Sequence, residues 1–158
     1  NWQSIVDPRL PPIASPPSRE AILAELGLPT QSRLLGSCGP LMAAQNTTDV
    51  VWIGMLLKIL HDDLRIVLVG DGPRREALQR FVTLGEVVDR TRIVSSPAEF
   101  ERIAPHLSLY LDAAKWTGPS SALLAAQSYG VPVVAVVRGA ECAHADAPRL
   151  PPFREPHL

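Results

Sequence analysis

The chain has 158 residues, of which 46% are hydrophobic and 20% charged, and its formal net charge is −1. This composition is typical of a globular protein with one domain-sized core, and it provides no basic surface of the kind that binds nucleic acid. The longest apolar runs, IVLV and VPVVAVV, are far shorter than the ~20 residues that a membrane-spanning helix needs. No basic-then-apolar segment begins the chain, so no signal peptide is predicted.

Proline is concentrated near both ends of the chain. Of the 16 prolines, many lie in PRLPPIASPPS at 8–18 and in PRLPPFREP at 148–156. Because proline cannot donate to a sheet and resists helix interiors, both segments are expected to be extended. The sequence therefore predicts an interdomain linker over residues 1–17, one folded domain over 18–140 and a proline-rich tail over 141–158.

The first third of the chain predicts a helix, a strand and a second helix. Ser18 is suited to cap a helix over 19–26, and RLLGSCG at 33–39 predicts a short apolar strand. A second helix is predicted over 49–61, with a cap from one of the polar residues at 46–48. Its apolar side chains recur at helical spacing and are expected to form the buried face: Val50, Ile53, Leu56, Leu57 and Leu60.

The run LRIVLV at 64–69 leads directly into Gly-Asp-Gly-Pro at 70–73. The run has no polar alternation, which is typical of a strand that is covered on both faces. The two glycines permit a tight turn, and Pro73 suits the first turn of a helix, where its missing N–H is not needed. A helix is therefore predicted over 74–84, and Asp71 is expected to hydrogen-bond within its own loop.

The second half of the chain continues the alternation. TRIV at 91–94 predicts a third strand, and SPAE at 96–99 has the spacing of a helix capping box. LSLYLD at 107–112 predicts a fourth strand. GPSSALLAAQSYG at 118–130 predicts a turn, a helix and a terminal glycine, and VPVVAVV at 131–137 predicts a fifth strand.

Alternating strands and helices predict the α/β class. We expect a doubly wound, Rossmann-like and mostly parallel sheet of about five or six strands, with helices on both faces. In such sheets ligands bind outside the carboxyl ends of the strands. Three loops would lie at that edge: CGPLMAAQN after the first strand, GDGP after the second and AAKWTGPSS after the fourth.

Two long segments carry a family resemblance. LVGDGPRREALQRFVTLGEVVDRTRI and LDAAKWTGPSSALLAAQSYGVPVVA resemble the C-terminal, donor-binding domain of group 1 (family 4) glycosyltransferases, which have the glycosyltransferase B fold. The resemblance covers roughly residues 20–138, and IVDPRLPP resembles the linker that enters this domain. It implies that the parent protein transfers a sugar from a nucleotide-sugar donor to an unknown acceptor. It also implies a missing N-terminal, acceptor-binding domain, without which this half is expected to be inactive.

The predicted donor site surrounds the helix that follows TGPSS. The free N–H groups and the dipole of a helix N-terminus favour an anion such as a diphosphate. For Ser120, helix capping alone is an equal alternative, and a solvated surface lysine is the favoured interpretation of Lys115. The candidate donor-binding residues are Gly39, Gly118, Pro119, Ser120, Ser121 and Lys115.

Four positions depart from the family pattern. The two family carboxylates, which serve the sugar and the ribose, fall at Thr117 and Ala125, and the family's Arg and Lys fall at Pro40 and Gln45. One hydrogen bond to a charged group is worth ~1.5–3 kcal/mol, so losing the ribose carboxylate alone weakens donor affinity about ten- to hundredfold. The catalytic residues are therefore unknown. A catalytically degenerate module with a structural or sugar-nucleotide-binding role is the alternative function, and a sugar-nucleotide epimerase of the same topology is a third hypothesis.

No cofactor and no metal are expected, because the nucleotide sugar is a substrate and no metal-ligand spacing occurs. The expected partners are the nucleotide-sugar donor and the acceptor-binding domain, with no nucleic acid and with any peripheral membrane association only through the parent protein. The two cysteines, Cys38 and Cys142, form no disulfide framework, which favours a cytoplasmic location.

Overall fold

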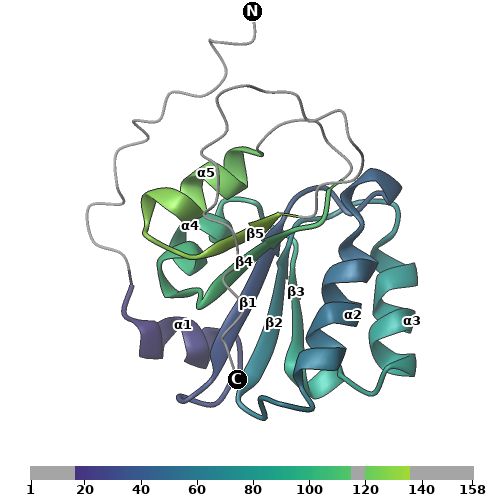
Figure 1. The fold of residues 1–158 in the computed structure, drawn as a ribbon, viewed down its shortest axis with the longest axis horizontal. Helices are drawn as coiled ribbons and strands as arrows, with labels where there is room; N and C mark the ends of the chain where they lie inside the picture. Colours follow the sequence, from purple (N-terminus) through teal and green to yellow (C-terminus); the bar gives the residue numbers. More distant parts are fainter. Residues whose placement is uncertain (1–16, 115–119, 136–158) are drawn as a thin grey trace, which may run out of the picture.

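The computed structural model describes residues 17–114 and 120–135, which form an α/β domain (Figure 1). The helices are α1 (Arg19–Glu25), α2 (Thr47–Leu57), α3 (Arg75–Leu84), α4 (Glu99–Ile103) and α5 (Ser121–Ser128). The strands are β1 (Arg33–Cys38), β2 (Leu64–Val69), β3 (Thr91–Val94), β4 (Leu109–Asp112) and β5 (Val133–Ala135). Short 3₁₀ turns occur at Ala43–Gln45, Val88–Arg90 and Ala104–His106.

The five strands form one parallel sheet in the order β3-β2-β1-β4-β5. β1 and β2 pair over their full length, from Arg33 opposite Leu64 to Cys38 opposite Val69. α2 and α3 lie on one face of the sheet, and α1, α4 and α5 lie on the other (Figure 1). The predicted doubly wound, Rossmann-like sheet is therefore confirmed, with five strands among the described residues.

The core consists of two apolar clusters, one on each face of the sheet. In β2, Ile66 and Leu68 belong to the cluster under α2 and α3, whereas Val67 and Val69 belong to the cluster under α1, α4 and α5. All four side chains are at most 2% exposed, because successive side chains of a strand point to opposite faces and both faces are covered. Burying each one stabilises the fold by about 1.5–3 kcal/mol.

The first helix and the strands β1, β2 and β3 lie where the sequence predicts them. Ser18 caps α1, and its Oγ accepts a hydrogen bond from the N–H of Ala21 at 3.2 Å. Gly27 follows the helix with φ of 61°, in the left-handed region that terminates many helices. The local signals in this part of the chain therefore agree with the tertiary structure.

The buried face predicted for the second helix is partly wrong. The helix spans Thr47–Leu57 rather than 49–61, and Leu56 and Leu60 are 51% and 75% exposed. Gly54 determines which face approaches the sheet, because a Cβ at this position would lie 2.3 Å from Cδ1 of Ile66. This close approach turns Leu56 outward. The residues of α2 that are fully buried among its apolar positions are Val50, Val51 and Gly54.

α4 and β4 begin two residues later than the sequence predicts, and so does β5, which begins at Val133 rather than at 131. The capping box at 96–99 does not form, because the N–H of Glu99 donates to the carbonyl of Ser96 in a turn and α4 begins only at Glu99. β4 begins at Leu109 rather than at Leu107, whose N–H donates to the carbonyl of Ala104 at the end of a 3₁₀ turn. At α4 and β4 a turn occupies residues that the local pattern assigned to the next element.

The predicted domain boundaries fall largely outside the described residues. Except for Pro17, the linker over 1–17 lies outside them, as do residues 136–140 of the predicted domain and the tail over 141–158. Within the described residues, none of the helices has both the length and the apolar character that crossing a membrane requires.

Candidate functional site

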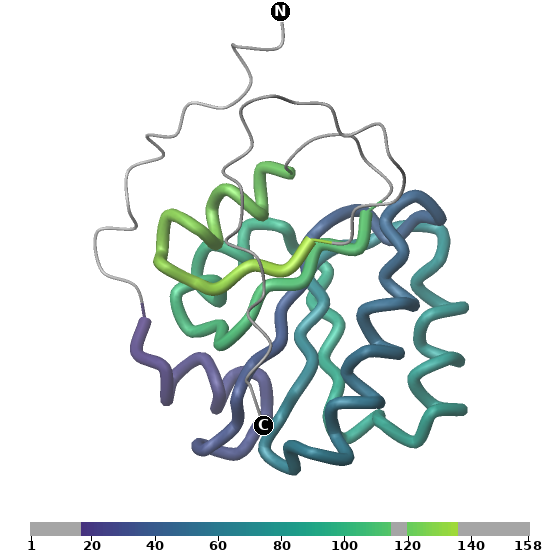
Figure 2. Tube along the Cα trace, viewed as in Figure 1, coloured from purple at the N-terminus to yellow at the C-terminus, as the bar shows by residue number. Residues whose placement is uncertain are grey.

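A cavity of about 490 Å³ opens at the carboxyl edge of the sheet, and we call it the donor cavity. The carboxyl ends of the strands meet at this edge, close to the start of α5 (Figures 1 and 2). The loops predicted to meet there, CGP after β1 and GDGP after β2, both contribute to its walls. The described lining residues are 38–40, Gln45, 69–71, Ser95, Pro97 and 120–122.

Close backbone contacts between the first two loops build one side of this cavity. Gly70 has φ of 148°, and a Cβ at this position would lie 2.0 Å from the carbonyl oxygen of Gly39. The N–H of Gly39 donates to the carbonyl of Val69 at 3.0 Å, and the N–H of Leu41 donates to the carbonyl of Asp71 at 2.9 Å. Only glycine fits where two backbones approach this closely, which explains the glycine that ends β2. Hydrogen-bonded backbone of the two loops therefore forms this side of the cavity.

The opposite side of the cavity is the N-terminus of α5. Oγ of Ser120 accepts the N–H of Leu123 at 3.1 Å and donates to Oδ2 of Asp112 at 2.9 Å. Oδ1 of Asp112 accepts the N–H of Ala114 at 3.1 Å, and Asp112 is only 9% exposed. The capping interpretation of Ser120 is confirmed, and its single hydroxyl proton is donated to Asp112. Binding of a ligand by Ser120 stays a prediction.

Ser121 and Ala122 are the first two residues of α5, and both line the donor cavity. Their N–H groups belong to the first turn of the helix, which has no intrahelical acceptors for them. The positive end of the helix dipole lies at the same point and favours a negatively charged group. The cavity therefore contains one element that is suited to an anion, as the sequence predicts for Ser121.

The side chains that line the donor cavity carry no positive charge among the described residues. Pro40 and Gln45, at the positions to which the resemblance assigns the family's cations, both line it. Gln45 is 6% exposed, and its Nε2 donates to the carbonyl of Cys38 at 3.5 Å. Asp71 is the one charged residue among the described lining, and its Oδ1 accepts the N–H of Gly72 at 2.8 Å within its own loop, as predicted.

The remaining candidate residues do not join this group in the described structure. Ala125 packs against the core cluster under α1, α4 and α5 and does not line the donor cavity. Lys115, Thr117, Gly118 and Pro119 lie outside the described residues. Gly39, Ser120 and Ser121 are therefore the candidate donor-binding residues that the structure brings together.

Cys38 lines the donor cavity and was missed by sequence reasoning as a site residue; Tyr110 of β4 hydrogen-bonds to its backbone from outside the described lining. The Tyr110 hydroxyl donates to the carbonyl of Cys38 at 3.3 Å and accepts its N–H at 3.4 Å. Burial raises the pKa of the Cys38 thiol to about 11, and burial also raises the pKa of the Tyr110 hydroxyl. The one signal in the sequence that could have indicated Cys38 is its position, because it is the last residue of β1 and therefore lies at the edge of the sheet where ligands bind.

Comparison with known proteins gives matches at the level of solved structures. No protein-family model matches the sequence, and no curated protein sequence matches it at a significant level. The C-terminal domain of the group 1 glycosyltransferase LpcC from Francisella tularensis superposes with a TM-score of 0.63 at 15% identity, covering 75% of this chain and 64% of that chain. The structure of HepE of Anabaena in complex with UDP and glucose superposes with a TM-score of 0.59 at 19% identity. The match covers 77% of this chain and 34% of that chain.

A third structure, TarM of S. aureus in a complex that includes UDP, gives a TM-score of 0.62 at 10% identity and covers 66% of this chain and 21% of that chain. This chain thus spans less than two thirds of each of these structures. At sequence identities this low, the structural similarity establishes the fold alone. The described residues therefore form a domain with the fold of the C-terminal domain of group 1 glycosyltransferases of the glycosyltransferase B architecture, as the sequence resemblance predicted.

Proposed function

We propose that this domain binds a nucleotide sugar in the donor cavity and that its parent protein is a glycosyltransferase. The observation that supports this most directly is the position of the N-terminus of α5 in the wall of a cavity at the carboxyl edge of the sheet. HepE, which has this fold, is seen with UDP and glucose, and TarM is seen with UDP. A volume of about 490 Å³ lies within the ~300–1,000 Å³ range of ligand pockets.

In this proposal the diphosphate of the donor accepts hydrogen bonds from the N–H groups of Ser121 and Ala122. Each such bond to a charged group is worth about 1.5–3 kcal/mol. The rest of the cavity, between Val69 and Pro97, accommodates the nucleoside. The described lining offers no cation, so the helix dipole and the backbone donors provide the stabilisation of the negative charge.

The proposed reaction is sugar transfer without a metal or cofactor. The oxygen of an acceptor hydroxyl forms a bond to the anomeric carbon, and the proton of that hydroxyl is released to solvent. The bond from the anomeric carbon to the diphosphate breaks, and the nucleoside diphosphate leaves with the bonding electron pair. The acceptor would be bound by a separate N-terminal domain. A cytoplasmic location and a role in carbohydrate biosynthesis belong to the same proposal.

A binding module that does not catalyse transfer stays the alternative hypothesis, which was predicted from the uncharged residues at Pro40 and Gln45. Removing one preorganised group that stabilises the charge of a transition state costs about 2.7–4 kcal/mol, or a hundred- to thousandfold in rate. Such a module would retain donor binding through α5 and would lack the cations that assist the departure of the diphosphate.

Thermal unfolding of the 158-residue chain with millimolar UDP, GDP or ADP, and with their sugar conjugates, tests the binding proposal. A nucleotide at a hundred times its dissociation constant adds ~2.7 kcal/mol, which raises the midpoint by several degrees for a domain of this size. A rise with one base supports the proposal and identifies the donor class, whereas no rise with any nucleotide contradicts it. Release of nucleoside diphosphate by the full-length parent, in the presence of acceptor, then separates the enzyme from the binding module.

A further inference from the structure

Asp71 is the one charged residue that the described part of the chain contributes to the lining of the donor cavity. Its side chain is 60% exposed, and Oδ1 accepts the N–H of Gly72 at 2.8 Å. Within the described residues no hydrogen bond is formed to Oδ2. A carboxylate accepts hydrogen bonds through both of its oxygens and cannot donate them. Asp71 can therefore accept a hydrogen bond from a ligand that brings a donor group.

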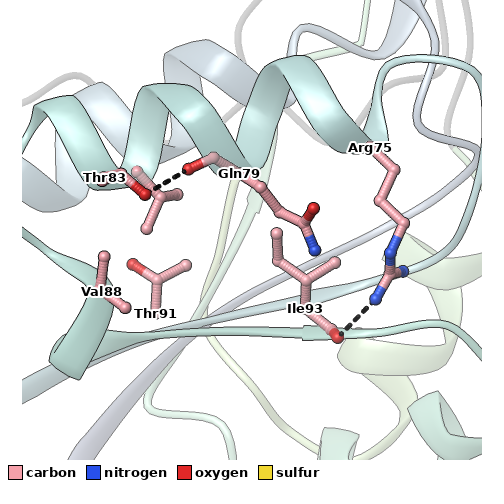
Figure 3. Close-up of a pocket in the computed structure, with 7 residues that line it drawn as sticks. Arg75, Gln79, Thr83, Val88, Thr91 and Ile93 are labelled. Carbon is pink, nitrogen blue, oxygen red and sulfur yellow. Dashed lines mark hydrogen bonds between the residues drawn. The ribbon is translucent and has the colours of Figure 1, made fainter.

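Arg75 is the cation next to this carboxylate. Its Nη1 lies 3.7 Å from Oδ1 of Asp71, which is close enough for an ion pair and too long for a hydrogen bond. The guanidinium is also attached to β3, because Nη2 donates to the carbonyl of Ile93 at 3.4 Å. Figure 3 shows Arg75 at one end of a smaller cavity, of about 230 Å³, between α3 and β3. The ion pair engages Oδ1, so Oδ2 is the oxygen that remains for a ligand.

The sheet determines how far Asp71 lies from the N-terminus of α5. Cys38 of β1 pairs with Val69 of β2, and the register of β1 with β4, continued for two residues, places Asp112 level with Cys38. Neighbouring strands lie about 4.8 Å apart, so β2 is about 10 Å from β4 across the carboxyl edge. Asp112 holds the α5 cap residue Ser120, whereas Asp71 follows Val69 by two residues. About two strand spacings therefore separate Asp71 from the start of α5.

This spacing selects the part of a nucleotide that reaches Asp71. With its diphosphate at the start of α5, a nucleotide extends across the end of β1 toward the ends of β2 and β3. Several covalent bonds join the β-phosphate to the ribose hydroxyls, and their combined reach is similar to this spacing. Ser95 and Pro97, which follow β3, line the cavity next to β2 and leave room for the base. In dinucleotide-binding sheets an acidic side chain at this edge accepts hydrogen bonds from ribose hydroxyls.

We propose that Asp71 recognises the ribose of the donor, with its carboxylate accepting hydrogen bonds from the 2′ and 3′ hydroxyls. This inference rests on the proposed function, because it assigns one part of the donor cavity. Repulsion between Asp71 and the diphosphate is the opposite effect, and it is weak at a separation of about 10 Å, because the Debye length is about 8 Å at physiological ionic strength. The donor cavity therefore prefers a ribonucleotide to the same nucleotide without its ribose hydroxyls.

The first experiment compares UDP with 2′,3′-dideoxy-UDP by calorimetric titration of the 158-residue chain. GDP and ADP are each compared with their own dideoxy forms in the same way. A hydrogen bond to a charged group changes affinity about ten- to hundredfold, so the dideoxy nucleotide should bind more weakly by at least tenfold. Equal dissociation constants for the two forms of a nucleotide that binds would overturn ribose recognition.

Two variants assign the recognition to Asp71. Asp71→Ala should weaken UDP binding at least tenfold and leave the affinity for 2′,3′-dideoxy-UDP unchanged, so the preference for ribose disappears. Asp71→Asn retains an oxygen for the N–H of Gly72, which preserves the loop, and should lose only part of the preference because a neutral acceptor forms a weaker hydrogen bond. Tighter UDP binding in Asp71→Ala would show that repulsion is the main effect of Asp71, and this result would contradict the proposal.

Glu76→Ala is the matched control. It removes the same charge from the first turn of α3, and Glu76 lines neither cavity among the described residues, so both dissociation constants should stay within twofold of the wild type. An undiminished preference for ribose in Asp71→Ala would assign the recognition to another residue and overturn the inference. If none of the nucleotides binds, the proposed function fails as well, whereas binding without a preference for ribose contradicts the role of Asp71 alone.

Discussion

The hydroxyl of Ser120 donates a hydrogen bond to Oδ2 of Asp112 at 2.9 Å, which ties the cap of α5 to the last residue of β4. The other carboxylate oxygen of Asp112 accepts the N–H of Ala114, so one buried carboxylate holds both the segment that leaves the strand and the start of the helix. The N-terminus of α5 is therefore held in the wall of the donor cavity before any ligand binds.

Replacing Asp112 with alanine should destabilise the domain by about 3 kcal/mol, because two donors lose a charged acceptor. Asp112→Asn is the matched control. Its side-chain oxygen can still accept the N–H of Ala114, and its amide can donate to Oγ of Ser120. The asparagine variant should therefore lose less than half as much unfolding free energy as the alanine variant. Urea unfolding measures both values. Equal losses for the two variants would mean that the hydrogen bonds do not account for the role of Asp112.

Replacing Ser121 with proline should weaken nucleotide binding about ten- to hundredfold and leave the helix intact. Ser121 is the first residue of α5, a position where proline is well tolerated, so the change removes one N–H donor without breaking the helix. Ser121→Ala keeps the N–H and separates the contribution of the hydroxyl. Calorimetric titration with UDP measures the affinities, and circular dichroism checks the helix. Unchanged affinity in the proline variant would exclude this N–H as a phosphate ligand.

Replacing Gly70 with alanine should destabilise the domain by about 3 kcal/mol or more, because the new Cβ would lie 2.0 Å from the carbonyl oxygen of Gly39. Gly27→Ala is the control for backbone strain alone. Gly27 has φ of 61°, and a Cβ at this position would have no heavy atom within 4 Å, so its cost should be only about 1–2 kcal/mol. Urea unfolding of both variants tests the comparison, and similar costs would show that the contact with Gly39 is unimportant.

The thiol of Cys38 should react slowly with alkylating reagents. Its pKa rises to about 11 from an ordinary value of 9.0, so at pH 8 the folded protein contains about a hundredfold less thiolate than the unfolded chain. A Cys142→Ser variant restricts the measurement to Cys38. A rate equal to that of the urea-unfolded chain would contradict the burial of the thiol.

The same raised pKa makes stability depend on pH in the alkaline range. The unfolded chain releases the thiol proton near pH 9 while the folded protein keeps it to about pH 11, so the contribution of Cys38 to stability is complete below pH 9 and is lost as the pH rises toward 11. The buried hydroxyl of Tyr110 acts in the same direction at higher pH. Urea unfolding between pH 8 and 11 should therefore show a smaller decline in Cys38→Ala than in the wild type. Identical declines would contradict the assignment to Cys38.

Much of the fold could be predicted because its signals are local. The apolar run at 66–69 and the capping residue Ser18 determine their elements within a few residues of sequence. The buried face of α2 could not be predicted in the same way, because it depends on the contact of Gly54 with Ile66 in the next strand. Periodicity alone favoured Leu56, which the structure leaves half exposed.

The candidate site could likewise be predicted only in part. The rule that ligands bind at the carboxyl ends of parallel strands was sufficient to bring Gly39 and Ser121 to one cavity. It could not show that Asp112 takes the hydroxyl proton of Ser120, since that bond depends on side-chain geometry. Nor could it reveal the cavity between α3 and β3, whose lining residues come together only through tertiary packing.

Titration of the isotope-labelled chain with UDP, followed by backbone amide NMR, tests the central claim most directly. Binding in the donor cavity predicts saturable shifts at the amides of Gly39, Gly70, Ser121 and Ala122, with the largest changes at the start of α5. Saturable shifts confined to residues that do not line this cavity, or no saturable shift at millimolar UDP, would contradict the proposal that this domain holds a nucleotide-sugar donor there.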